Sequence, residues 1–369
     1  MILNSLVDAA AEKVRLGGRL LPDEALALYD DNNLLLLAAL ARAVKERKSG
    51  RDVYFNVNRH INLTNICAAR CPLCAFGRGP SDEGAYVMDK EEVVATVRRA
   101  AAEAPDLSEV HIVSALHPDK PFSYYLDIVT AVKEVLPQVH LKAFTPVEIW
   151  HFAAISGRPV GEVLAALTAA GLDSLPGGGA EILDDNVRRV ICPRKASSAA
   201  WTEVVTAAHR LGIPTNATML YGHIETPRQR LEHLFKLRAI QDETGGFQAF
   251  VAFPFHPENT GLPHLSRVGA WEDLKMVAVA RLVLDNFDHI KAFWMMLTLP
   301  VAQLALAFGA DDLDGTVAEE KIIHAAGART GTSIAREEIV ALIRETGYSA
   351  VERDTFYNRR RVWGEGNNG

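Results

Sequence analysis

Three closely spaced cysteines are the residues of this sequence that point most directly to chemistry. Cys67, Cys71 and Cys74 occur in the segment NRHINLTNICAARCPLCAFGRG with the spacing Cys-x3-Cys-x2-Cys. Thiolates are the usual protein ligands of iron–sulfur clusters. A cubane has four irons, so three cysteines leave one iron free to bind a small chelating molecule, such as an amino acid with free amino and carboxylate groups. The spacing therefore predicts a [4Fe–4S] cluster with one open iron.

Other uses of clustered cysteines have to be weighed against this cluster. A structural zinc site normally has four ligands; His60 could be one, but no second Cys-x2-Cys or His-x3-His pair is present. A ferredoxin-type carrier needs a fourth cysteine nearby, whereas Cys192 lies far along the chain and is better explained as a small buried apolar residue. A non-catalytic iron–sulfur or zinc protein is the alternative of another class. A metal-dependent hydrolase is weaker, since it would show a His-x-His strand motif.

Composition and charge favour a water-soluble enzyme. The chain has 369 residues, of which 49% are hydrophobic, and this is enough to form the core of one large domain or two ordinary ones. Its net charge is -7. The mild acidity argues against binding to nucleic acid or anionic lipid. The N-terminus has no basic region before an apolar core, and the apolar stretch 292–310 is interrupted by Thr298, Pro300 and Gln303. We expect a cytoplasmic protein with neither nucleic acid nor membrane as a partner.

The rest of the chain supplies elements that can position the cysteines. Residues 1–50 have helical periodicity, and from about Asp52 short apolar runs alternate with amphipathic helical stretches at least six times. This alternation indicates a parallel sheet with helices outside, and over roughly 250 residues it predicts an α/β fold of the TIM-like β/α-barrel type. A doubly wound open sheet is the alternative. The apolar runs are VYFNV, EVHIVSA, HLKAFTP, IPTNATMLYG, GFQAFVAF and HIKAFWMM.

We divide the chain into three parts: an N-terminal helical segment (1–50), the barrel (51–315) and a C-terminal segment (316–369) packed on the barrel. The last segment is polar and is expected to be helical or mixed α/β. Polar residues follow several of the apolar runs. Because barrel sites are built at the carboxyl ends of the strands, these residues are expected at one mouth.

Longer motifs give the chain a family resemblance. The cysteine loop on a β/α barrel resembles the radical S-adenosylmethionine superfamily. Within it, the sequence is similar to the aminofutalosine synthases, whose relatives include futalosine cyclases and FO synthase subunits. The matching motifs run from about Asn56 to Tyr357 and include HINLTNIC, CAFGR, SLPGGGAEI, HRLGIPTNATMLYGHIET, FHPENT and FGADDLDGTVAEEKI.

The resemblance implies a specific reaction. In this superfamily the open iron binds the methionine part of S-adenosyl-L-methionine, and one electron from the reduced cluster breaks the C–S bond to give a 5′-deoxyadenosyl radical. For this branch it implies addition of that radical to 3-[(1-carboxyvinyl)oxy]benzoate, migration of the ether bond and loss of a carboxylate, giving 6-amino-6-deoxyfutalosine. S-adenosylmethionine is then consumed as a co-substrate. A donor such as flavodoxin or ferredoxin would supply the electron. The alternative within the family is a hydrogen-abstracting relative.

The resemblance also implies which residues hold the cofactor. Ser114 and Ala115 stand where the family has Gly-Gly near the methionine amino group. Leu73, before the third cysteine, stands where an aromatic residue often lies near adenine, and Phe76 follows in the same loop. The glycine run PGGGAE allows close backbone approach. Its members Gly178, Gly179 and Glu181 are expected to hold the cofactor, with an ordinary glycine turn and a solvated glutamate as the alternative.

A substrate with two carboxylates needs cations or clustered hydrogen-bond donors. The candidates are His60, Arg78, Lys142, His223 and His256, of which we favour His223 and Arg78 as catalytic residues. Each histidine taken singly is as readily explained by a structural role, and Arg78 could instead balance the charge of the cluster. The acids of GADDLDGT, Asp311, Asp312 and Asp314, are expected either to cap a following helix or to act in the site.

Overall fold

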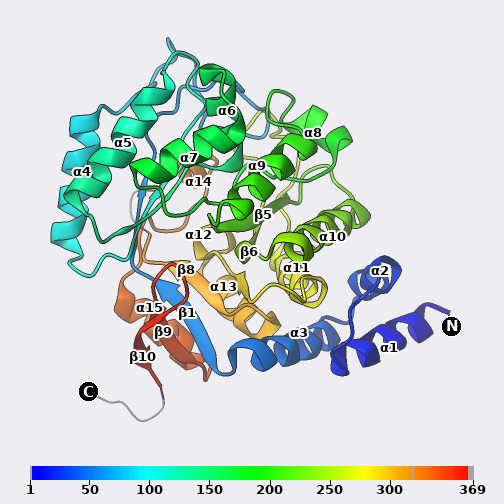
Figure 1. The fold of residues 1–369 in the computed structure, drawn as a ribbon. Coiled ribbons are helices and arrows are strands. Elements are labelled where there is room, and N and C mark those ends of the chain that lie inside the picture. Colours follow the sequence, from blue (N-terminus) through cyan, green and yellow to red (C-terminus); the bar gives the residue numbers. More distant parts are fainter. Residues whose placement is uncertain (1, 318–319, 365–369) are drawn as a thin grey trace.

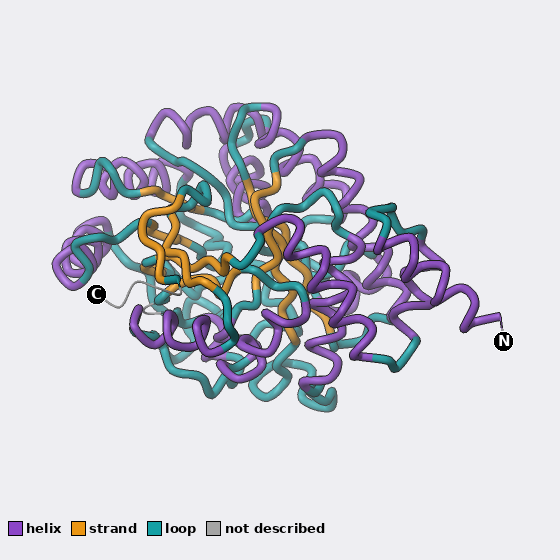
Figure 2. The backbone as a smooth tube through the Cα atoms, turned by 90° about the horizontal axis from the view of Figure 1, so that it is seen from below, coloured by secondary structure: helices purple, strands orange, loops and turns teal. Residues whose placement is uncertain are grey.

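Strands lie in the interior of the molecule and helices lie around them, as Figure 2 shows. The computed structural model describes residues 2–317 and 320–364. The helices are α1 (Ile2–Arg15), α2 (Pro22–Asp30), α3 (Leu34–Ser49), α4 (Lys90–Glu103), α5 (Phe122–Val135), α6 (Pro146–Ser156), α7 (Val160–Ala170), α8 (Asp185–Ile191), α9 (Ser198–Arg210), α10 (Pro227–Thr244), α11 (Ala270–Val283), α12 (Trp294–Leu297), α13 (Leu299–Ala305), α14 (Ile322–Ala325) and α15 (Arg336–Glu345). The strands are β1 (Asp52–Asn56), β2 (Asn58–Ile61), β3 (Glu109–Ile112), β4 (His140–Ala143), β5 (Thr215–Tyr221), β6 (Phe247–Pro254), β7 (His289–Lys291), β8 (Asp312–Gly315), β9 (Ser349–Arg353) and β10 (Arg359–Trp363).

Strands β1 to β8 close into a parallel barrel, and β9 with the antiparallel β10 extends the sheet beyond β1. One sheet has the order β10-β9-β1-β8-β7-β6-β5 and the other β2-β3-β4. Because β2 continues β1 after Val57, the two sheets join on one side. On the other side, single bridges from Lys142 to Ser174 and from Leu175 to Thr215 connect β4 to β5. The predicted β/α barrel is confirmed.

The barrel helices begin where the local sequence can satisfy their free N–H groups. Capping boxes begin at Asp89, Thr145 and Thr226. In each, the cap side chain accepts a hydrogen bond from the backbone N–H of the third helical residue, and the side chain of that residue accepts one from the backbone N–H of the cap. Each helix then buries residues three or four apart against the strands; in α5 these include Tyr125, Ile128, Val129 and Val132. Local signals and packing therefore favour the same elements.

The structure differs from the sequence expectation around residues 289–315. The run HIKAFWMM is only a short strand, β7, followed by α12, and Pro300 lies in the first turn of α13. The acids of GADDLDGT do not cap a helix but lead into and form β8. Asp311, just before this strand, and Asp312, within it, can be buried because Arg281 pairs with Asp311 at 2.7 Å and Arg353 donates to Asp312 at 2.8 Å.

The two ends of the chain both pack against the barrel (Figure 1). In the N-terminal part, α3 packs on α11 and α2 on α10. In the C-terminal part, α15 is accompanied by two strands, of which β9 pairs parallel to β1, so this segment is mixed and not only helical. None of the helices within the described ranges is long and apolar enough to cross a membrane.

Candidate functional site

A cavity of about 330 Å³ lies in the barrel, and the cysteine loop forms part of its wall. Among the residues that line it are those singled out above as cofactor contacts. They are Leu73, Phe76, Ser114, Ala115, Gly178, Gly179 and Glu181. The strands β2, β3, β5, β6 and β7 also contribute side chains to its wall. The barrel thus brings together segments that are far apart in the sequence.

The cysteine loop is tied to its surroundings through its backbone. Cys67 N–H donates to the Arg78 carbonyl at 2.9 Å, and Arg78 N–H donates to the Asn65 carbonyl at 2.7 Å. Cys67 and Cys74 line the cavity, while Cys71 is buried and its carbonyl accepts from Cys74 N–H at 3.0 Å. Burial raises the pKa of the Cys71 thiol to about 12, so a bound metal's positive charge is what would make it a thiolate.

The three thiols come from one short loop whose Cys-x3-Cys-x2-Cys spacing predicts a multi-iron cluster. Within residues 2–317 and 320–364, no three His, Cys, Asp or Glu side chains are already arranged around a position for a metal ion. A cubane takes each cysteine on a different iron and so needs the sulfurs spread apart. The open side of the loop faces the cavity through Cys67 and Cys74.

A buried ion pair lies beside this loop. Lys195 Nζ is 2.6 Å from Glu181 Oε1, and both residues line the cavity. Burial alone would lower the pKa of Lys195, but Glu181 and the thiols of Cys71 and Cys74 hold it well above its usual value. Glu181 has a φ of +48°, a left-handed conformation that costs a residue with a side chain free energy. Lys195 and Glu181 form a paired, overall neutral unit on the cavity wall, and together they would offer N–H donors and a carboxylate to a polar ligand there.

The glycine run is required by the protein's own packing as well as by the cavity. A Cβ on Gly177 would lie 2.3 Å from the Asn216 carbonyl oxygen. A Cβ on Gly179, whose φ is +83°, would lie 2.3 Å from Val147 Cγ2. The backbone therefore runs close to β5 and α6 while it lines the cavity.

Ser114 and Ala115 join the ends of two strands. Thr64 N–H donates to Ser114 Oγ at 2.9 Å, and Ala115 N–H donates to the Thr64 carbonyl at 3.1 Å. Glu148 Oε1 accepts from Ser114 N–H at 2.9 Å. The serine hydroxyl thus has a structural use that glycine could not provide, and the pair still lines the cavity.

The two residues favoured as catalytic lie outside the cavity wall. The His223 side chain is fully buried, with Nδ1 2.7 Å from Glu225 Oε2 and Nε2 3.1 Å from the Leu220 carbonyl. Arg78 donates to the carbonyls of Ala75 at 2.8 Å and Gly77 at 3.3 Å. In this structure His223 contacts Glu225 and a backbone carbonyl, and Arg78 holds backbone carbonyls of its own loop; neither is among the residues that line the cavity, and their catalytic role stays a prediction.

Of the other candidates, His60 and His256 line the cavity, whereas Lys142 is buried and paired with Glu109 at 2.9 Å. The sequence interpretation did not single out His111, Lys195, Lys291 or Glu320, which also line the cavity. A signal for His111 was present: it is a polar residue within the apolar run EVHIVSA, and in the structure it is paired in register with His60 between β2 and β3. Of the three acids in GADDLDGT, only Asp314 reaches the cavity.

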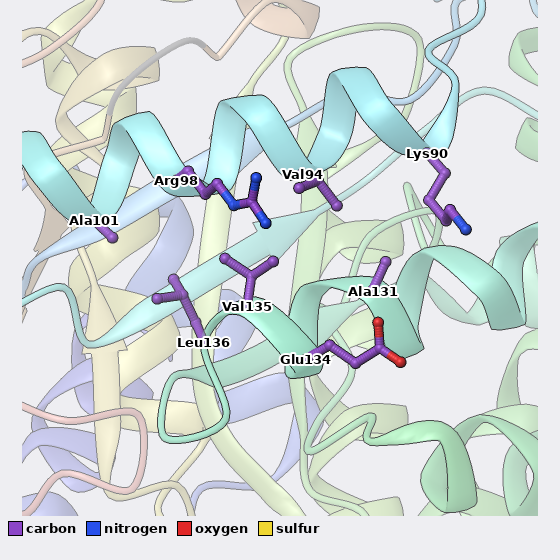
Figure 3. A pocket seen from close by; sticks show the side chains of 8 residues that line it. All are labelled: Lys90, Val94, Arg98, Ala101, Ala131, Glu134, Val135 and Leu136. Atoms are coloured by element: carbon purple, nitrogen blue, oxygen red, sulfur yellow. The ribbon is translucent and has the colours of Figure 1, made fainter.

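A second hollow of about 510 Å³ lies on the outside, between α4 and α5 (Figure 3). Val94 and Val135 face each other across it, with Arg98 and Glu134 alongside. It contains no cysteine, so it is not a candidate for the cluster.

Comparison with known proteins identifies the class. Residues 61–237 match the family model for the radical SAM superfamily, and residues 244–365 match the CofH/MqnC C-terminal region. The chain therefore belongs to the radical SAM superfamily and is an enzyme.

Curated relatives and solved structures agree with this class. Over 359 residues the chain is 47% identical to aminodeoxyfutalosine synthase of Thermus thermophilus, covering 96% of this chain and 95% of that one. It is also 42% identical, over 85% of this chain and 86% of the relative, to 5-amino-6-(D-ribitylamino)uracil–L-tyrosine 4-hydroxyphenyl transferase of Methanopyrus kandleri. Methylornithine synthase has the same fold, with a TM-score of 0.72 at 18% identity over 92% of this chain and 96% of its own.

Membership of this superfamily implies a [4Fe–4S] cluster and S-adenosylmethionine, and the site fits both. Cys67, Cys71 and Cys74 provide the thiols in one tethered loop. Lys195 and the glycine run lie on the same cavity wall as the loop, where they can hold the methionine and nucleoside parts. The part of the cavity formed by the strands is available for a small-molecule substrate.

Proposed function

We propose that the chain catalyses the synthesis of 6-amino-6-deoxyfutalosine from S-adenosylmethionine and 3-[(1-carboxyvinyl)oxy]benzoate, with loss of a carboxylate. The observation that carries this proposal is the 47% identity to aminodeoxyfutalosine synthase of Thermus thermophilus across 96% of the chain. When bound, the reduced cluster and S-adenosylmethionine supply a 5′-deoxyadenosyl radical. A reducing protein such as flavodoxin or ferredoxin would supply the electron.

The chain's own residues have three tasks in this reaction. The cysteine loop holds the cluster, and Lys195 with the glycine run orients the cofactor. The aromatic and aliphatic side chains of Val251, Phe253 and Phe293 form the wall near the strands and exclude water from the reacting groups. Polar groups at the end of this wall can hold the carboxylates of the substrate.

A second candidate reaction is favoured by the relative from Methanopyrus kandleri, which shares 42% identity. Its name describes transfer of the 4-hydroxyphenyl group of L-tyrosine to 5-amino-6-(D-ribitylamino)uracil. This chemistry starts by hydrogen abstraction, so it would release free 5′-deoxyadenosine. The synthase reaction instead keeps the adenosyl carbon in the product.

Product analysis by mass spectrometry separates the two reactions. The protein is reconstituted anaerobically with iron and sulfide, reduced, and given S-adenosylmethionine with either the enolpyruvyl benzoate or the tyrosine and uracil pair. We expect an adenosyl–substrate product from the benzoate only. Cys67→Ala should abolish it, whereas Cys192→Ala, which replaces a buried cysteine outside the Cys-x3-Cys-x2-Cys loop, should retain it. Free 5′-deoxyadenosine formed with the tyrosine pair would instead support the second reaction.

A further inference from the structure

The barrel interior presents a group of polar side chains that the cofactor does not need. His60 on β2, His111 on β3, Lys291 on β7 and Asp314 on β8 all line the cavity. They come from the strands themselves, whereas the cysteines come from the loop beyond β2. Asn58 lies two residues before His60 on the same face of its strand. We call His60, His111 and Lys291, with Asp314, the inner polar group.

The hydrogen bonds of Asn58 determine which nitrogen of His60 carries the proton. Val317 N–H donates to Asn58 Oδ1 at 2.9 Å, so the amide nitrogen of Asn58 is turned toward His60. That nitrogen lies 3.5 Å from His60 Nε2, and because an amide N–H can only donate, Nε2 is the acceptor. The ring proton is therefore on Nδ1, and His60 has an N–H to offer within the cavity wall.

His111 has a donor position with no partner. Its ring centre lies 4.4 Å from that of His60, with 50° between the ring planes. Its Nε2 is buried and makes no hydrogen bond with the described residues. A buried polar atom without a partner costs free energy unless a ligand satisfies it. In the tautomer with the proton on Nε2, His111 carries a second N–H that no protein group satisfies. This atom has almost no accessible surface, so a ligand oxygen would reach it when the ring turns toward the cavity that His111 lines.

The charges around these rings balance in the absence of a ligand. Lys291 Nζ lies 2.5 Å from Asp314 Oδ1, and Lys142 pairs with Glu109 at 2.9 Å. These four groups are the charged groups that act on His60. Burial lowers the pKa of His60 to about 4 and that of His111 well below its usual value, so both rings are neutral donors at neutral pH. An ammonium has three N–H groups, so Lys291 can hold Asp314 and a ligand oxygen together.

We propose that the inner polar group binds the ring carboxylate of the aromatic substrate, with N–H donors from His60, His111 and Lys291. The inference deepens the proposed function and rests on it. Phe253 and Phe293, whose ring centres are 5.7 Å apart in an edge-to-face arrangement, line the same cavity and suit an aromatic ring. The alkene must meet the adenosyl carbon near the cysteine loop. The carboxylate on the ring is the group that reaches farthest from it.

The test compares an acid with its neutral ester. Cluster-loaded wild-type protein with S-adenosylmethionine is titrated by equilibrium dialysis with 3-methoxybenzoate and with its methyl ester. We expect the acid to bind about tenfold or more tightly than the ester, as charge-assisted hydrogen bonds to a carboxylate should provide. His111→Phe keeps an aromatic ring but removes the donor, so this preference should fall by about tenfold. His111→Gln, with an amide donor, should keep part of it.

A matched control uses another buried histidine. His151 lies on α6 outside the cavity wall and contacts the His117 carbonyl at 2.9 Å. His151→Phe makes the same replacement, and the acid preference should be unchanged. An equal preference in wild type and His111→Phe would overturn the proposal, as would a wild type that binds acid and ester alike. Because binding is measured without turnover, a lack of adenosyl product would instead count against the proposed function alone.

Discussion

At the scale of single residues, the cysteine loop and the glycine run are constrained in different ways, the first by chemistry and the second by the space around the backbone. The cysteines are defined by their chemistry, and any loop with the same spacing could present them. The glycines are defined by space, since Gly177 faces a backbone carbonyl that cannot move aside. A flexible side chain could give way, but the Asn216 carbonyl belongs to β5. Substitutions in the run should therefore affect folding before they affect catalysis.

We expect Gly177→Ala to destabilise the protein by about 1–3 kcal/mol, because its Cβ would force β5 and the cavity wall apart. The control is Gly161→Ala in α7, where an added Cβ meets nothing within 4 Å. Alanine is the better helix former by about 1 kcal/mol, so this variant should be as stable as wild type or more so. Urea unfolding of both variants measures the difference. Equal stability of the two would show that the wall relaxes freely.

His223 and Glu225 provide a pH-dependent test of whether His223 has a structural role. Burial would raise the pKa of Glu225, but its contacts with His223 and Arg230 lower it to about 2. A carboxyl with a depressed folded-state pKa contributes stability above its unfolded value of about 4.3. That contribution is lost as the pH falls toward 2. From the two values it is on the order of 3 kcal/mol.

We therefore expect wild type to lose more stability than Glu225→Gln between pH 5 and pH 3, measured by guanidinium unfolding at each pH. At pH 7, His223→Gln should lower the unfolding free energy while the cluster-loaded enzyme still cleaves S-adenosylmethionine. Loss of cleavage in a variant of unchanged stability would instead support the prediction that His223 is catalytic.

At the scale of elements, local patterns predict some parts of the barrel much better than others. Helices such as α4 and α10 have caps and a regular apolar period, so their positions follow from neighbouring residues. The strand β8 was missed because its acids are buried only through arginines distant in sequence. His111 was missed for a related reason. Strand periodicity shows that it shares a face with Glu109, but only closure of the ring shows that this face borders a cavity.

The arginine partner of β8 can be compared with a similar pair at the surface. Arg353 on β9 is 1% exposed and donates to Asp312 at 2.8 Å, whereas Arg361 on β10 is 51% exposed and lies 3.2 Å from Asp106. Removing one partner of a buried pair leaves an uncompensated charge and costs about 3–5 kcal/mol. An exposed pair contributes about 1 kcal/mol or less. Arg353→Leu should thus be far more destabilising than Arg361→Leu in thermal unfolding, and similar losses would contradict this account of β8.

At the scale of the whole molecule, the division into three parts at residues 50 and 315 stays a prediction, and the contacts between the parts argue that they fold together. Arg230 of α10 donates to the Tyr29 hydroxyl of α2 at 2.5 Å. Arg19 pairs with Asp242 at 2.9 Å, and Ser49 is hydrogen-bonded to Asp311. These contacts connect the first 50 residues to α10 and to the start of β8.

We expect deletion of residues 1–50 to expose the apolar faces of α10 and α11 and to leave Glu272 and Arg230 without Tyr29, so that the remaining chain aggregates or fails to fold.

In the full chain, the N-terminal helices and the barrel should then unfold in one transition. An engineered tryptophan at exposed Leu16 would report on α1, while buried Trp294 reports on the barrel. In a Trp-free background with one probe at a time, coincident urea curves are expected. An earlier transition at position 16, with the barrel signal unchanged, would show that the N-terminal segment is an independent unit whose contacts with α10 and α11 add little to the stability of the barrel.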